Sequence, residues 1–80
     1  MKALFNCSVI KNVYLRDNDN MGVELEITCL DDADKTWVSR RGFDKLSQTN
    51  REYQIEIYTK AFEKLKQALL NNDKYVEIEL

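Results

Sequence analysis

The last third of the chain changes its hydrophobic period twice, and this change constrains the fold more than any other feature. Between Tyr53 and Tyr58 apolar and polar residues alternate, which is typical of a half-buried strand. After Thr59 the apolar residues recur at spacings of three and four, as on one face of a helix: Ala61, Phe62, Leu65, Ala68 and Leu69. A polar tripeptide follows, and alternation then returns up to Leu80. We therefore expect a strand, a helix over about 59–71 and a closing strand.

The N-terminal segment carries apolar side chains at odd positions and predicts one long strand over 2–16. These odd-numbered apolar residues include Phe5, Cys7, Val9, Val13 and Leu15. Side chains two residues apart in a strand point to the same face, so they would line one face of a sheet. Lys11 is the exception, which predicts a bend or bulge near the middle of the strand, or exposure at the mouth of a barrel.

Two polar turns divide the next part of the chain. The segment 17–22 combines short polar residues with a glycine, so the strands on either side of it should form an antiparallel hairpin. The inward positions of the second strand would be Val23, Leu25, Ile27 and Cys29. A second polar turn over 31–35 precedes a third strand over 36–43, and 44–51 is expected to be a loop. The helix is too short to be stable alone in water and must pack against this sheet.

These elements predict a single α+β domain over residues 1–80. We expect a small curved antiparallel sheet, or a partly open barrel of four or five strands, with one helix. The 80 residues include 44% hydrophobic residues, enough for one modest core. Fourteen acidic and twelve basic residues give a net charge of −2, which argues against broad attraction to nucleic acid or to an anionic membrane.

The sequence predicts a cytoplasmic protein without a membrane segment. No apolar run reaches the length of a membrane span, and the first six residues lack the apolar core of a signal peptide. We expect Cys7 and Cys29 to be buried reduced thiols, although a disulfide between adjacent strands remains an alternative.

No pattern indicates an enzyme, a cofactor site or a metal site. The chain has no histidine, and its two glycines do not form a phosphate-binding loop. Asp17, Asp19 and Gly22 resemble the start of a calcium loop, but Met21 and Thr28 stand where oxygen ligands belong. We therefore expect a non-enzymatic protein.

One segment combines a large aromatic residue with fixed positive charge. Trp37, Arg40, Arg41 and Phe43 lie within one predicted strand of an otherwise acidic chain. Trp37, Arg41 and Phe43 would share a face that could stack bases while arginine meets phosphate. Tryptophan and arginine are also enriched at protein–protein contacts. The remaining alternative is that both aromatic rings belong to the core and the arginines extend over it.

Two stretches resemble the second half of the oligonucleotide-binding (OB) fold of bacterial and phage single-stranded DNA-binding proteins. They read Ile55-Glu56-Ile57-Tyr58-Thr59-Lys60-Ala61-Phe62-Glu63-Lys64-Leu65 and Asn72-Asp73-Lys74-Tyr75-Val76-Glu77. The long first strand and its hairpin partner also suit that fold. The resemblance covers about 28 residues well and implies an OB-like barrel. In it, Trp37 and Phe43 would stack bases, and Arg40, Arg41 and Lys11 would contact phosphates.

These observations favour a non-enzymatic binding module that contacts single-stranded nucleic acid. The alternative is a small phage or mobile-element protein that binds and inhibits a host protein complex, for example in an anti-CRISPR-like role. Pairing of free strand edges into a homodimer is a further alternative. In each case we expect the contact surface to be centred on Trp37, Arg40 and Arg41.

Overall fold

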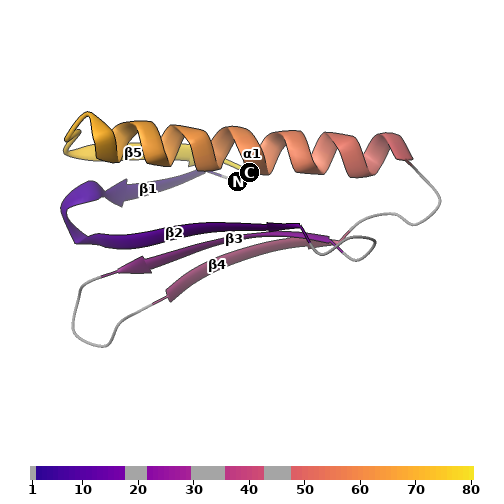
Figure 1. Ribbon diagram of the computed structural model, residues 1–80, viewed down its shortest axis with the longest axis horizontal. Helices are drawn as coiled ribbons and strands as arrows, with labels where there is room; N and C mark the ends of the chain where they lie inside the picture. Colours follow the sequence, from indigo (N-terminus) through magenta and orange to yellow (C-terminus); the bar gives the residue numbers. More distant parts are fainter. Residues whose placement is uncertain (1, 18–21, 30–35, 43–47) are drawn as a thin grey trace.

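The computed structural model describes residues 2–17, 22–29, 36–42 and 48–80, which form an α+β architecture (Figure 1). The elements in chain order are β1 (Lys2–Asn6), the short 3₁₀ helix η1 (Cys7–Val9), β2 (Ile10–Asp17), β3 (Gly22–Cys29), β4 (Thr36–Gly42), α1 (Gln48–Leu70) and β5 (Tyr75–Glu79). Within the described ranges, no helix has the length and apolar character needed to cross a membrane.

The strands form two antiparallel sheets. β1 pairs with β5, and β2, β3 and β4 form a second sheet in that order. The long helix α1 runs along both sheets, and the described strands do not close into a barrel (Figure 1). The predicted α+β class, with antiparallel strands and one helix, is confirmed in its partly open form.

The single strand predicted over 2–16 is in fact two strands joined by η1. Asn6 begins this turn, and its Oδ1 accepts a hydrogen bond from the Ser8 amide at 3.0 Å. The register of β2 against β3 then shifts between Ile10 and Asn12, which makes Lys11 the extra residue of a bulge. The predicted irregularity near Lys11 is therefore confirmed. One N-terminal segment consequently contributes a strand to each sheet.

The strand predicted over residues 53–58 is wrong, because these residues belong to α1. The buried residues of the helix follow one another at spacings of four and three: Gln54, Tyr58, Ala61, Leu65 and Ala68. This spacing places them on one face, whereas the alternation that suggested a strand covers only six residues. A glutamine occupies the core-facing position nearest the start of the helix, so the spacing of the apolar residues does not indicate that the first turns are helical. Residues 48–51, predicted to be part of a loop, are also helical.

Backbone hydrogen bonds and a left-handed asparagine end α1. Asn72 has φ 57°, and its amide donates to the carbonyl oxygen of Leu69 at 3.3 Å. The Asp73 amide donates to the carbonyl oxygen of Ala68 at 3.0 Å. This pair of bonds forms a Schellman motif, in which asparagine takes the position usually held by glycine. The chain therefore turns back at once into β5.

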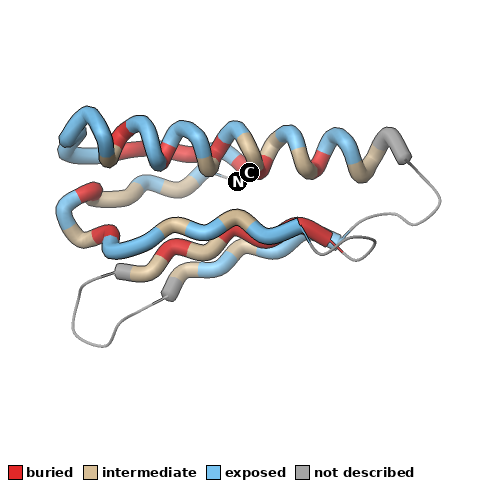
Figure 2. Tube along the Cα trace, viewed as in Figure 1, coloured by how far each residue is buried: buried red, intermediate tan, exposed pale blue. Residues whose placement is uncertain are grey.

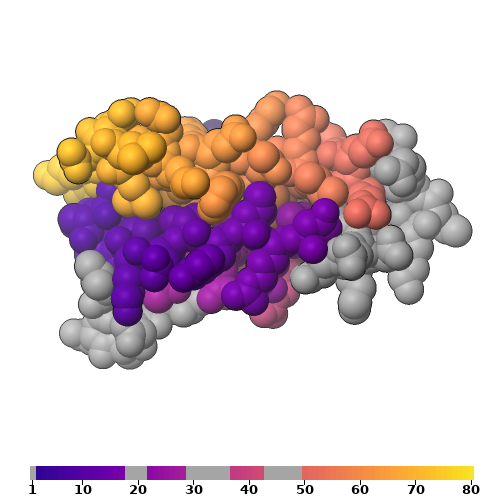
Figure 3. Space-filling model, viewed as in Figure 1, coloured from indigo at the N-terminus to yellow at the C-terminus, as the bar shows by residue number. Residues whose placement is uncertain are grey.

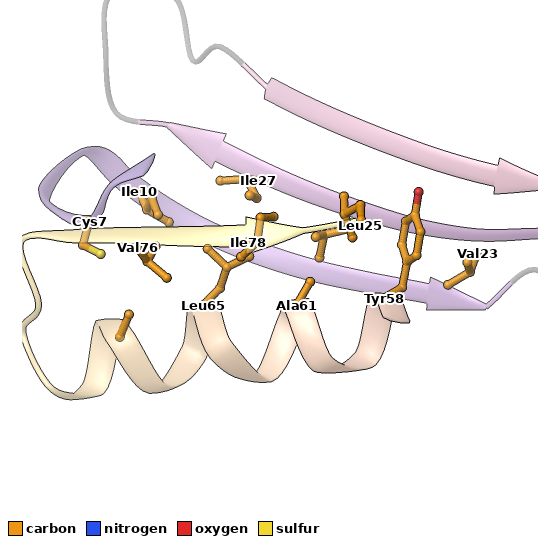
Figure 4. Close-up of a cluster of buried hydrophobic side chains, with 12 residues drawn as sticks. Cys7, Ile10, Val23, Leu25, Ile27, Tyr58, Ala61, Leu65, Val76 and Ile78 are labelled. Atoms are coloured by element: carbon orange, nitrogen blue, oxygen red, sulfur yellow. The ribbon is translucent and has the colours of Figure 1, made fainter. Parts of the chain in front are cut away.

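The core lies between α1 and the two sheets (Figures 2 and 4). Val23, Leu25 and Ile27 of the central strand β3 are at most 2% exposed, as their inward positions predicted. Val76 and Ile78 of β5 are also buried. Figure 4 shows these side chains gathered on the strand-facing side of α1. The helix therefore holds the two sheets together.

Candidate functional site

Trp37 lies on the core side of β4, where it joins the two sheets. It is half-buried, and its ring meets the ring of Phe5 edge-on, with centroids 5.1 Å apart and an interplanar angle of 79°. Phe5 belongs to β1, in the other sheet. Both rings pack against the buried core. Trp37 therefore contributes to packing, as the core interpretation expects.

Arg40 lies on the opposite face of β4, where it binds a buried carboxylate. Its Nε donates to Oε2 of Glu24, its cross-strand neighbour, at 2.5 Å. Glu24 is only 8% exposed, although the alternation of β3 points it away from the core. The hydrogen bond to Glu24 and the charge of that carboxylate raise the pKa of Arg40 from its ordinary value. The arginine thus covers and neutralises Glu24.

A second ion pair crosses the same outer face of the three-stranded sheet. The Arg16 guanidinium lies 3.4 Å from Oε2 of Glu26. Tyr14 and Val38 pair with Glu26 on either side and are 45% and 38% exposed. This outer face therefore combines two partly exposed hydrophobic side chains, Tyr14 and Val38, with arginines that already have carboxylate partners.

The structure does not bring the five predicted site residues together. Trp37 and Arg41 share one face of β4, as predicted, and Arg40 lies on the other. Lys11 is exposed in the bulge near Ile10, which pairs with Cys29, whereas Arg41 pairs with Val23 at the far end of the sheet. Phe43 lies outside the described residues.

Arg41 lines a groove of about 470 Å³ between β4, α1 and β5. Its lining residues are Arg41, Tyr53, Ile57, Lys60, Ala61, Lys64, Glu79 and Leu80. The volume is within the usual range of ligand pockets, about 300–1,000 Å³. None of the described lining residues belongs to β2. The side chains of β2 lie against those of α1 on the face drawn in Figure 3.

The groove has an apolar floor and a positive rim. Ala61 and Leu80 are buried, and Ile57 is half-buried. Among the described residues, three cationic side chains and one acidic side chain, that of Glu79, line the groove, in a chain whose net charge is −2. The groove is therefore a local positive site on an acidic protein.

Two of these three cations have no ion-pair partner among the described residues. Lys60 lies 3.0 Å from Oε1 of Glu56, one helical turn earlier, and both side chains are mostly exposed. Neither Arg41 nor Lys64 takes part in an ion pair with the described part of the chain.

The strands beside the groove each have an edge without a described partner. β4 pairs with β3 and β5 pairs with β1, and within the described ranges neither has a second neighbour. The unpaired edge of a strand presents amide and carbonyl groups to which another chain can bind. The groove thus combines charge, apolar surface and unpaired backbone.

Sequence reasoning missed most of the groove because it placed α1 too late. Tyr53 and Ile57 line the groove only because the helix begins at Gln48. The four-and-three spacing from Gln54 to Ala68 is the signal that would have extended the helix. Lys60 and Lys64 stand out in the sequence as a charged helix face but not as part of a concave site.

A second, smaller hollow of about 310 Å³ borders Cys7 at the C-terminal end of α1. Cys7 is a free, buried thiol. Burial, and secondarily the charge of Asp73, raise the pKa of Cys7, which keeps the thiol protonated and weakly nucleophilic. No cluster of potential metal-binding side chains occurs within the described residues.

Comparison of the chain with protein-family models, with curated proteins and with solved structures finds no match.

Proposed function

We propose that this protein is a non-enzymatic binding module that captures part of a partner protein in the groove between β4, α1 and β5. One observation supports this proposal: Arg41, Lys60 and Lys64 line a groove with an apolar floor, beside strand edges that have no described partner. Such a surface offers charge, buried area and backbone hydrogen bonds to a polypeptide.

The positions of Trp37 and Arg40 support a protein partner over the nucleic-acid partner favoured by the sequence. Trp37 packs against Phe5, and Arg40 is bound to Glu24. OB-like modules bind oligonucleotides across the face of their second and third strands. Here Arg16 and Arg40 of the corresponding outer face pair with Glu26 and Glu24, so these two pairs leave no net positive charge to attract phosphate.

Single-stranded nucleic acid is the second candidate, and one observation favours it. Tyr53 is 58% exposed and lines the same groove as Arg41, Lys60 and Lys64. A base could stack on this ring while Arg41 and Lys64 meet phosphates. In this alternative the OB-like resemblance holds, but the ligand binds at the groove rather than at Trp37.

Within the class of protein-binding modules, we propose an inhibitor of a host protein complex, as phages and other mobile elements encode. An anti-CRISPR-like role belongs to this class. The free thiol of Cys7 agrees with a reducing, cytoplasmic site of action.

A capture experiment with matched variants tests the proposed function. The tagged protein is incubated with host lysate, with and without nuclease, and the same is done with Lys64→Glu and with Lys66→Glu. Both substitutions reverse one exposed charge of α1, but Lys66 lies over the ring of Phe62, with its Nζ 5.2 Å from the centroid, and does not line the groove. We expect a captured protein to survive nuclease and Lys66→Glu and to be lost with Lys64→Glu. Capture that requires nucleic acid, or is indifferent to Lys64→Glu, would contradict the proposal.

A further inference from the structure

We infer that the groove takes an extended acidic segment, which adds as a β-strand to the free edge of β4 and sets alternate carboxylates against Lys60 and Lys64. The inference rests on the proposed function and names the chemistry of the partner at the same site.

The edge of β4 is suited to strand addition, in contrast to the opposite edge of the same sheet. β4 pairs with β3 along its whole length, from Thr36 to Gly42, without a shift of register. It contains no proline and no bulge, two features that commonly protect strand edges. The other edge strand, β2, carries the bulge at Lys11 and packs against α1. Among the described residues, the regular edge that no other element covers is therefore the one beside the groove.

The charge of the groove selects an acidic segment. Arg41 belongs to β4 itself, and Lys60 and Lys64 face it from α1 across the groove. Glu79 is the one acidic side chain that the described part of the chain contributes to the lining. A basic segment would meet this positive rim with repulsion, while an acidic one gains charge-assisted hydrogen bonds.

The spacing of the two lysines matches the repeat of a strand. Lys60 and Lys64 are four residues apart on the helix, which corresponds to about 6 Å along its axis. Alternate residues of a strand are about 6.6 Å apart and point to the same side. Since α1 and β4 run along the same long direction of the molecule (Figure 1), carboxylates at positions i and i+2 of an added strand can face both lysines.

The floor of the groove offers apolar contact to the stems of the side chains of an added strand that face α1. Ala61 and Leu80 are buried, Ile57 is half-buried, and the Tyr53 ring stands at one rim. Because alternate side chains of a strand point to opposite faces of the sheet, apolar residues between the acidic ones would point away from the lysines, to the outer face where Val38 of β4 is 38% exposed. The structure thus favours a segment in which acidic and apolar residues alternate.

A peptide titration tests this inference with the full chain. The probe is a fluorescein-labelled nonapeptide in which glutamate alternates with valine, and its anisotropy is followed. We expect saturable binding that Lys64→Glu weakens about tenfold or more, because a close charge pair becomes repulsive. The matched variant Lys66→Glu should change the affinity less than about twofold, because that charge lies outside the groove.

Two N-methylated peptides separate strand addition from simple charge attraction. An added strand donates hydrogen bonds to its neighbour through alternate amides. Methylating the amides of one edge of the peptide should abolish binding, while methylating the other edge should preserve it. If both methylated peptides bind like the parent, strand addition is overturned. Strand addition is also overturned if oligothymidylate displaces the peptide, or if the chain dimerises through β4 and excludes it.

The failure of this inference and the failure of the proposed function have different signatures. If Lys64→Glu loses a captured protein but the peptide does not bind, strand addition is wrong and the groove remains the binding site. If Lys64→Glu alters neither capture nor peptide binding, both proposals are wrong.

Discussion

The two halves of α1 face the core with different chemistry. The C-terminal half packs Leu65 and Ala68 into the core against β5, and these residues are 0% and 4% exposed. The N-terminal half faces the core with Gln54 and with Tyr58, and Figure 4 shows the Tyr58 ring pointing toward the strands. It also supplies Tyr53 and Ile57 to the groove. The C-terminal half therefore faces the core with apolar side chains and the N-terminal half with polar groups, while both halves line the groove, since Lys60, Ala61 and Lys64 belong to the C-terminal half.

The polar atoms of the N-terminal half explain this division. The hydroxyl groups of Tyr58 and Ser39 are hydrogen-bonded at 2.7 Å, which ties α1 to β4. Oε1 of Gln54 has no hydrogen-bond partner among the described residues, although the side chain is buried. Buried polar groups contribute less to stability than apolar ones but fix a specific geometry. The hydrogen bond between Tyr58 and Ser39 therefore positions the helix beside the edge of β4.

Truncation of Leu65 should have the largest effect on stability. Leu65→Ala leaves a cavity at a fully buried site and should lower the free energy of unfolding by about 2–5 kcal/mol. Leu65→Asp would bury a charge there and should abolish cooperative unfolding. Denaturant titration measures both. Leu70→Ala, at a residue 75% exposed on the same helix, is the control and should change stability by less than about 0.5 kcal/mol.

Removal of the Tyr58 hydroxyl should have an intermediate effect. Tyr58→Phe keeps the buried ring and loses the bond to Ser39, so we expect a loss of about 1 kcal/mol. A double-mutant cycle with Ser39→Ala measures the coupling directly. Additive losses from the two single variants would show that the two hydroxyls do not interact.

Replacement of Gln54 should have the smallest effect and could have the opposite sign. Leucine has about the volume of glutamine, and Gln54→Leu removes the buried Oε1 that lacks a described partner. The free energy of unfolding should therefore stay the same or rise. A loss of more than about 1 kcal/mol would indicate that this amide is satisfied in the folded chain. That result would remove the contrast between the two halves of α1.

The sequence predicts those parts of the fold whose pattern is apolar and regular. The inward faces of Val23, Leu25 and Ile27 follow from alternation, and the bulge at Lys11 follows from one charged residue on an apolar face. The start of α1 is not predicted, because glutamine and tyrosine occupy its core-facing positions. In addition, six residues alternate between apolar and polar as they would in a strand. Periodicity reports apolarity and misses a helix face built from polar side chains.

The candidate site is less predictable than the fold because it depends on three elements distant in sequence. Arg41 is a predicted site residue, but its partners Lys60 and Lys64 enter the site only when α1 packs beside β4. The sequence allows Trp37 to belong either to the core or to a contact surface. Its ring contacts Phe5 only because the N-terminal segment is divided between two sheets. No local pattern encodes either packing arrangement.

Amide hydrogen exchange along β4 tests the groove most directly. Exchange is measured on the full chain with and without the alternating glutamate–valine peptide at saturation. We predict that alternate amides within Thr36–Gly42 become strongly protected, because the added strand accepts their hydrogen bonds, while β2 is unchanged. Unchanged exchange throughout β4, or protection confined to β2 and the outer face around Tyr14, would contradict the assignment of the groove as the binding site.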